Sequence, residues 1–366
     1  MAFGKWPLGQ ATLATLAARR APRRTLRGSR VPWCVFSAPA DQTVPSDSPV
    51  PPASAELVRY LTASGGVSVK VLTATELVRH ATDLHGGMSH VAKHALGRAL
   101  MANILLTAGK DTGETVQLKL QGGGPLGLVC TEAVTGEDGV VSARGFVEHK
   151  GYEHPGDEGA AGFVGACVGR EGYLEVRRRH PSWKEGYTGV VGLRSGEVGD
   201  DVALYLLTSE QVRSVVGVGV ALHPVTGEVT AAAGFLCSAL PGCSDGELDA
   251  LEANVLALPP PSELARLLPG AAARRLMRGL EGEASEGGAM SLASRWTESV
   301  ELRCGCGARD TARALLAATP GCQGGTDGLA PEFAADVTCE WCGKCTAMTP
   351  LDIEREMAEF ARSSES

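Results

Sequence analysis

The feature that most constrains this chain of 366 residues is a group of six cysteines within 42 residues near the C-terminus. Four of them have the spacing C-x-C…C-x-x-C, in the stretches RCGCGARD and TCEWCGKC: Cys304, Cys306, Cys339 and Cys342. A C-x-x-C turn presents two sulfurs to one ion, and glycines beside the C-x-C pair supply the flexible backbone that it needs. The pattern predicts a tetrahedral Zn²⁺ site. The same thiols are also two ready disulfides, so spacing alone leaves a structural clamp and a redox switch both open.

Composition narrows the class of protein. Eleven cysteines in a chain of this length are too sparse for a small disulfide scaffold, and their clustering favours metal or redox chemistry. The chain is 44% hydrophobic and 21% charged, as in ordinary soluble globular proteins. A net charge of −8 argues against a general nucleic-acid binder. No run of 18 uncharged apolar residues occurs, so no membrane span is expected.

The first 40 residues contain no Asp or Glu but seven Lys and Arg, which predicts an organelle transit peptide. The stretch VPWCVFSA (31–38) favours import into the chloroplast stroma. The mitochondrial matrix is the alternative, and the cytoplasm follows if the segment is only a basic tail. The Pro/Ser-rich residues 41–55 are expected to be disordered.

Residues 56–243 predict an α+β core domain with a large, mostly antiparallel sheet and packed helices. Alternating apolar residues at 66–74, and on both sides of the Gly-rich stretch QGGGPLG, indicate strands. Helices are expected at 75–86, where Thr75 would cap the first turn, at 88–110, where apolar residues recur along one stripe, and within 198–212.

Residues 244–300 predict a helical linker, in two segments separated by Pro259–Pro261. Residues 301–366 form the predicted zinc-binding unit, with helices at 308–319 and 349–360. Thr349 is the expected cap of the second helix, Pro350 its first residue, and Asp352 completes the capping pattern. A unit this small cannot build a large core, so metal binding is expected to supply much of its folding energy.

Other motifs in the sequence give weaker evidence of function. Gly122, Gly124 and Gly127 spell the dinucleotide fingerprint, but a strand follows them instead of a helix, which favours a tight sheet turn. His90 and His94 lack the Glu of a zinc-peptidase helix. No catalytic triad or dyad is legible, so we do not expect an enzyme. The alternatives are a zinc ribbon that binds nucleic acid or protein, and a dithiol oxidoreductase that uses CEWC.

Six stretches together resemble the heat-shock protein 33 family, the redox-regulated holdase chaperones. They are HALGRAL (94–100), QGGGPLGLV (121–129), RGFV (144–147), EGYTGVVGLRSGEVGDDVALYLLTSEQV (185–212), FLCSALPG (235–242) and the C-x-C…C-x-x-C pattern with CEWCGK. The resemblance covers about residues 57–360. It departs from the family at Gly123, where Asp is common, and at Cys345, where the usual residue of the family is not cysteine.

The resemblance implies a mechanism. The reduced chain holds one Zn²⁺ and is inactive. Oxidation forms the disulfides Cys304–Cys306 and Cys339–Cys342, releases zinc, and unfolds the terminal unit and the redox-sensitive linker. The oxidised chain dimerises and binds unfolding client proteins without ATP. Two further thiols, Cys322 and Cys345, are candidate extra ligands or resolving thiols. The linker residues expected to bind clients, and to be buried while the linker is folded, are Leu248, Leu251, Val255, Leu256, Leu264 and Leu267.

Overall fold

The computed structural model describes residues 54–156, 162–259, 261–264, 269–280, 294–308, 311–312 and 335–364. Several predictions concern residues outside these ranges: the transit peptide, nearly all of the Pro/Ser-rich segment, most of the helix expected at 308–319, Cys322 and Leu267. None of the described helices is both long and apolar enough to cross a membrane.

The described strands form a ten-stranded sheet in the order β7-β6-β3-β4-β5-β10-β1-β2-β9-β8, and a separate hairpin of two. Neighbours in the large sheet are antiparallel, except for the parallel pair β10 and β5. This confirms the predicted α+β class. The strands are β1 (Ser54–Leu61), β2 (Val67–Thr73), β3 (Thr115–Gln121), β4 (Leu128–Thr135), β5 (Val141–Val147), β6 (Tyr173–Arg179), β7 (Tyr187–Gly192), β8 (Ser214–Leu222), β9 (Val229–Ala239) and β10 (Ser294–Leu302).

Helix α2 (His90–Thr107) is the centre of the larger hydrophobic cluster and packs on β4, β5 and β8. The sequence predicted one apolar stripe, but the helix is buried on nearly every side. Gly97 permits this because a Cβ there would lie 2.7 Å from side-chain carbons of Val78 and Val220. The buried Asn103 amide donates to Val116 O at 3.1 Å and to Thr131 Oγ1 at 3.2 Å, so its donors are satisfied.

Helix α1 (Thr75–His85) lies beside α2, and its start corrects the predicted cap. The residue before the helix is Ala74, and no side chain caps the first turn. Thr75 is the first helical residue, and its Oγ1 accepts a hydrogen bond from Ala232 N of β9 at 3.1 Å. A cross-link to the neighbouring strand therefore replaces the local cap. The helix ends at Gly86, with φ of +52°, as predicted.

The Gly-rich stretch joins β3 to β4 as a turn, as predicted. Its glycines have a packing reason. A Cβ on Gly122 would lie 2.3 Å from Gly169 O, and one on Gly124 would lie 2.3 Å from Cys167 O. The turn lies against the end of α3 (Phe163–Val168), where only glycine fits.

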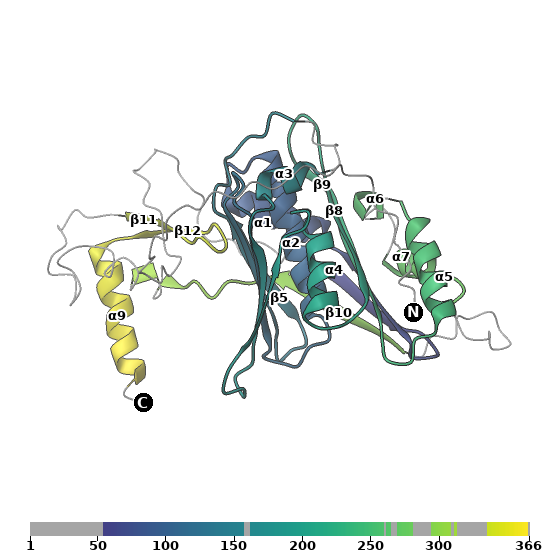
Figure 1. The fold of residues 1–366 in the computed structure, drawn as a ribbon. Helices are drawn as coiled ribbons and strands as arrows, with labels where there is room; N and C mark the ends of the chain where they lie inside the picture. The colour runs from purple at the N-terminus through teal and green to yellow at the C-terminus, as the bar shows by residue number, and fades with distance from the viewer. Residues whose placement is uncertain are drawn as a thin grey trace, which may run out of the picture. The chain divides into compact units, whose positions relative to one another are not determined.

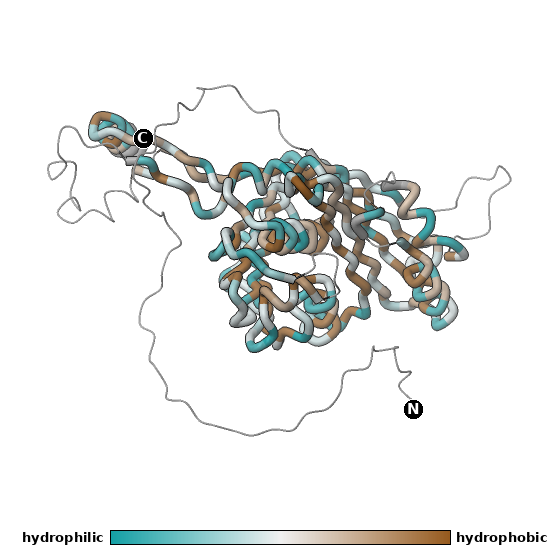
Figure 2. The backbone as a smooth tube through the Cα atoms, turned by 90° about the horizontal axis from the view of Figure 1, so that it is seen from above, coloured by the Kyte–Doolittle hydropathy of each residue, from teal (hydrophilic) through white to brown (hydrophobic). Residues whose placement is uncertain are grey.

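The helices of the predicted linker pack on the other face of the sheet (Figure 1). They are α5 (Asp245–Leu256), α6 (Pro261–Leu264) and α7 (Pro269–Leu276). Adjacent residues of β1 point to opposite faces, so Leu57 joins the α2 cluster and Val58 joins the cluster under the linker helices. Figure 2 shows hydrophobic positions, in brown, interspersed with hydrophilic ones, in teal, along the folded backbone.

Strand β10 crosses the predicted boundary between linker and zinc unit at residue 300 and lies in the large sheet between β1 and β5. Its sequence SRWTESVEL is mostly polar, and it was not predicted as a strand. Main-chain pairing along the whole of β1 holds it, together with cross-strand contacts from Arg59 to Trp296 and Glu298. The last residue of β10, Leu302, therefore lies two residues before Cys304.

Candidate metal centre

The four cysteines come from two local structures. Cys304 and Cys306 lie on the segment that leaves β10. Cys339 and Cys342 lie on the turn between β11 (Ala335–Thr338) and β12 (Cys345–Met348). In this turn Cys339 N donates to Lys344 O at 2.9 Å, and Gly343 N donates to Cys339 O at 2.8 Å. Gly343 has φ of +73°, so glycine suits the position at which the chain reverses.

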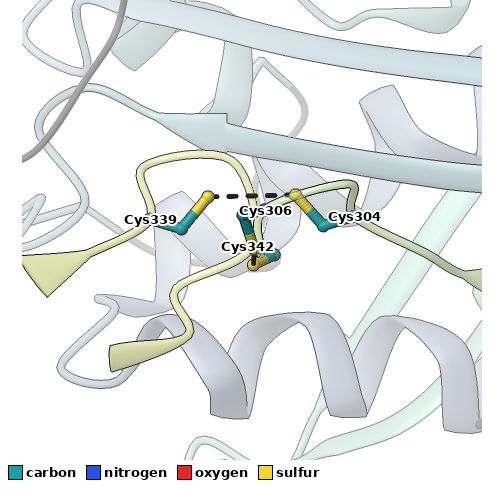
Figure 3. Close-up of side chains that lie close together, drawn as sticks. All are labelled: Cys304, Cys306, Cys339 and Cys342. Carbon is teal, nitrogen blue, oxygen red and sulfur yellow. Dashed lines mark hydrogen bonds between the residues drawn. The ribbon is translucent and has the colours of Figure 1, made fainter. Parts of the chain in front are cut away.

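The folded chain brings all four sulfurs together (Figure 3). Cys304 Sγ lies 3.8 Å from Cys339 Sγ, Cys306 Sγ lies 3.4 Å from Cys342 Sγ, and all four lie within 4.8 Å of one another. Thiolates around a tetrahedral zinc ion at about 2.3 Å are about 3.8 Å apart, which matches the first of these separations. Among the described residues this is the one such group of His, Cys, Asp and Glu side chains, and His90 and His94 are not part of it.

The thiols also differ in their proton affinity. Hydrogen bonds from Cys339 and Cys342, together with one from Arg144 Nη1 at 3.4 Å, lower the pKa of Cys304 far below the ordinary thiol value. Burial raises the pKa of Cys306 to about 12. Hydrogen bonding to Cys304 raises the pKa of Cys342. The lowered pKa of Cys304 favours its thiolate, which is the form that metals bind.

Two residues near this cluster were missed by sequence reasoning, Arg144 of β5 and Trp341 of the β11–β12 turn. The Arg144 guanidinium carbon lies 4.6 Å from the centroid of the Trp341 ring, and the same guanidinium contacts Cys304. No local motif links the two residues, because they lie 197 positions apart (341 − 144). The W in CEWC was the only available signal, since an aromatic residue in a small metal turn needs a surface to pack against.

The other cysteines that the structure describes lie outside this group. Cys345 begins β12, is exposed, and is outside the group of four sulfurs. Cys130, Cys167 and Cys237 are buried in the core. Burial raises the pKa of Cys130 and of Cys237 to about 12, which keeps both protonated and unreactive.

The linker residues that were expected to be buried divide into three groups. Leu251 and Leu264 are buried against the sheet, and Val255 packs at the edge of the same cluster. Leu248 is half-buried. Leu256 differs from the expectation, with 71% of its surface exposed, because it is the last residue of α5 and its side chain lies outside the cluster.

The chain combines an α+β core, with a helical layer on each face of its sheet, and a terminal unit with four gathered thiols. This combination defines a class of protein in which folding of the terminal unit can depend on metal binding. Comparison with known proteins identifies the family. The family model described as "Hsp33 protein" matches residues 55–347, and the chain belongs to this family, as the resemblance implied.

Curated relatives carry the name "33 kDa chaperonin". The relative from Pelobacter propionicus is 36% identical over 299 residues, which cover 78% of this chain and 88% of the relative. The one from Geobacter sulfurreducens is 33% identical and covers 82% of this chain and 93% of the relative. The one from Thermus thermophilus is 35% identical and covers 83% and 86%. These organisms are bacteria.

A solved structure supports the fold. The crystal structure of a 33 kDa chaperonin from Thermotoga maritima aligns with a TM-score of 0.69 and covers 84% of this chain and 99% of that chain. At 24% identity, this likeness shows a shared fold.

Proposed function

We propose that this chain is an ATP-independent holdase chaperone that oxidation switches on. One observation carries the proposal: two short cysteine pairs, 33 positions apart (339 − 306), place four half-buried sulfurs within 4.8 Å of one another. Family membership supports the chaperone part, and the relatives named 33 kDa chaperonin extend over nearly the same length. The clustered thiols support the redox part.

The donor set fits a zinc ion. Four thiolates form a closed structural set for Zn²⁺, and Cys304, Cys306, Cys339 and Cys342 would hold one ion per reduced chain. A bound ion would neutralise the thiolates and cross-link the segment after β10 to the β11–β12 turn. Arg144, which donates to Cys304, would offset part of the negative charge of a Cys₄ site.

Oxidation would convert the same thiolates to the disulfides Cys304–Cys306 and Cys339–Cys342, a pairing that rests on the family resemblance. Each disulfide forms as two thiolates lose two electrons to one peroxide molecule, which takes up two protons and becomes two molecules of water. Disulfides no longer supply thiolate ligands, so the cross-link between the two segments is lost.

Loss of that cross-link would free apolar surface for clients. Leu251 and Leu264 face the sheet in the folded linker, so they become available only when the linker helices leave it. Leu248 and Val255 would add to this surface, while Leu256 is exposed in both states. Unfolding proteins expose apolar segments that would bind there.

The test compares zinc-loaded reduced protein with peroxide-treated protein in the aggregation of a thermally unfolding client. We expect suppression only after oxidation, together with the release of about one zinc per chain, measured with a colorimetric chelator. Equal suppression by both forms, or by neither, would contradict the switch. Addition of ATP should change nothing.

We also propose that the oxidised chain is a homodimer and that residues 1–40 direct it to the chloroplast stroma. The dimer rests on the resemblance, and the compartment rests on the basic, acid-free leader. Sedimentation velocity of both redox forms tests the first proposal. A fluorescent protein fused behind residues 1–55 tests the second, with the mitochondrial matrix and the cytoplasm as the outcomes that would overturn it.

A further inference from the structure

The turn that carries Cys339 and Cys342 contacts the core through Trp341. The Trp341 ring lies over Arg144, and its centroid is 5.2 Å from that of Phe146, with the two rings at 86°. The Trp341 carbonyl accepts a hydrogen bond from Gly145 N at 3.2 Å. We call the surface formed by Arg144, Gly145 and Phe146 the Trp341 notch.

The core builds this notch without help from the terminal unit. Glu132 of β4 accepts hydrogen bonds from Arg144 Nε at 3.1 Å and from Nη2 at 2.6 Å, and these fix the guanidinium plane. Phe146 is a residue of β5 and is only 4% exposed with Trp341 packed against it. Gly145 has no room for a side chain, because a Cβ there would lie 2.6 Å from Thr131 Cγ2. No side chain therefore covers the main chain of β5 at Gly145.

The notch also lies at an open stretch of sheet edge. Strand β10 pairs with β5 only at residues 141–143. Beyond that point, Gly145 directs its C=O to His85 Nε2 at 2.8 Å and its N–H to Trp341. Gly145 is opposite Thr131 of β4, but neither of its main-chain groups is needed for that pair. If Trp341 leaves, an unpaired edge donor remains beside a cation and an aromatic ring.

We propose that, in the activated chaperone, the Trp341 notch binds aromatic residues of unfolded client segments, and that Trp341 occupies it in the reduced form. This inference rests on the proposed function, because the turn must leave the core when its cysteines are oxidised. Arg144 and Phe146 select an aromatic ring over an aliphatic side chain. Gly145 selects an extended backbone, whose carbonyl replaces that of Trp341.

The first test measures the selectivity of the oxidised chain. A short unstructured peptide with one tryptophan and a fluorescent label is titrated against a matched peptide with alanine in its place. We expect wild type to bind the tryptophan peptide about tenfold more tightly. Arg144→Gln and Phe146→Leu should each bring that ratio close to one. Equal affinity of wild type for the two peptides would overturn the proposal.

A second variant separates recognition from folding. Arg144→Lys keeps a cation beside the ring and an ion pair with Glu132, so it should retain part of the tryptophan preference that Arg144→Gln loses. A lysine variant as unselective as the glutamine variant, with both shown to be folded by circular dichroism, would contradict the cation's role in the notch.

The occupancy of the notch is tested in the reduced, zinc-loaded form. Trp341→Ala should let this form bind the tryptophan peptide, whereas reduced wild type should not bind it. Trp296→Ala is the matched control, because Trp296 is 42% exposed and stacks on Arg59, outside the notch. Zinc content is measured for each variant. If zinc-loaded Trp341→Ala binds no better than Trp296→Ala, Trp341 does not cover a binding site.

The aggregation assay distinguishes failure of the notch proposal from failure of the proposed chaperone function. If oxidised wild type suppresses client aggregation but shows no preference for the tryptophan peptide, the notch does not bind client aromatic residues and the proposed function stands. If oxidised wild type does not suppress aggregation, the proposed function fails first.

Discussion

The core and the cysteine-bearing terminal unit are stabilised in different ways. In the core, α2 is enclosed by the sheet, and a second apolar cluster lies under the linker helices. In the described part of the terminal unit, the buried residues are few: Thr311, Ala312, Val337, Gly343, Met348 and Ile353. Apolar burial stabilises the core whatever the state of the thiols. We expect the terminal unit to depend on its four gathered sulfurs, so that their oxidation would unfold it selectively.

The largest effect should come from removing one sulfur of the group. We expect Cys342→Ser to lose its zinc and, with it, metal-linked folding energy on the order of 10 kcal/mol. Amides of β11, β12 and α9 (Pro350–Ser364) should lose protection from hydrogen exchange, while those of α2 keep theirs. Loss of protection throughout the molecule would show that core and unit fold as one.

Cys345→Ser is the control for this experiment. Cys345 lies three residues from Cys342 but is exposed and outside the group of sulfurs. The variant should keep one zinc per chain and full protection of α9. Zinc loss in Cys345→Ser would mean that this thiol is a ligand.

The second-largest effect should come from weakening the core instead of the terminal unit. Leu96→Ala removes a fully buried side chain from α2 and should lower the free energy of unfolding of the core by about 2–5 kcal/mol, with zinc affinity unchanged. Denaturant titrations of the reduced and the oxidised protein should give the same loss. Leu207→Ala, at a residue that is 50% exposed, should change stability by less than about 0.5 kcal/mol.

A buried carboxylate provides a third test within the core. Asp201 of α4 (Gly199–Thr208) accepts hydrogen bonds from the main-chain N–H groups of Arg194 at 2.6 Å, Ser195 at 3.0 Å and Gly196 at 2.7 Å. Asp201→Asn places an amide donor among these donors and should cost about 1–3 kcal/mol in chemical denaturation. Asp200→Asn, in the same helical turn but exposed, should change stability little. Equal losses in both variants would mean that the helix dipole, and not the buried loop, needs the charge.

Local patterns were enough to predict much of this structure. Alternation predicted β2, β3 and β4, and cysteine spacing predicted the four sulfurs that the fold gathers. The terminal capping prediction is also confirmed: Pro350 begins α9, and Thr349 and Asp352 exchange hydrogen bonds. These features depend on neighbours within a few residues, and such neighbours can be read from sequence.

The features that sequence reasoning missed depend on distant partners. Strand β10 is too polar to predict, and β1 decides its structure. Thr75 bonds to β9 instead of capping its helix. Arg144 contacts Cys304 only because the sheet brings β5 beside the end of β10. In each case the deciding contact lies more than 100 residues away, and no local pattern encodes it.

The smallest effects compare the caps of the two regions. Thr349 Oγ1 caps α9, and Ser244 Oγ caps α5 through a capping box with Glu247. Each alanine substitution should lower stability by about 1 kcal/mol, so amide protection should fall about fivefold in the capped helix alone. Hydrogen exchange resolved by residue measures both. A loss in α5 caused by Thr349→Ala would mean that terminal unit and linker are already coupled before oxidation.

The Thr349→Ala measurement can be repeated at low pH, because hydrogen bonds from Thr349 hold the pKa of Asp352 below its usual value. A carboxylate whose pKa is lower in the folded state stabilises the fold above the pKa of the unfolded chain. That contribution is lost as the pH falls through the folded-state pKa. The advantage of wild type over Thr349→Ala in α9 protection should therefore be full at pH 6 and shrink below about pH 4. An advantage that stayed constant down to pH 2 would mean that the Thr349 hydroxyl caps α9 without the Asp352 carboxylate.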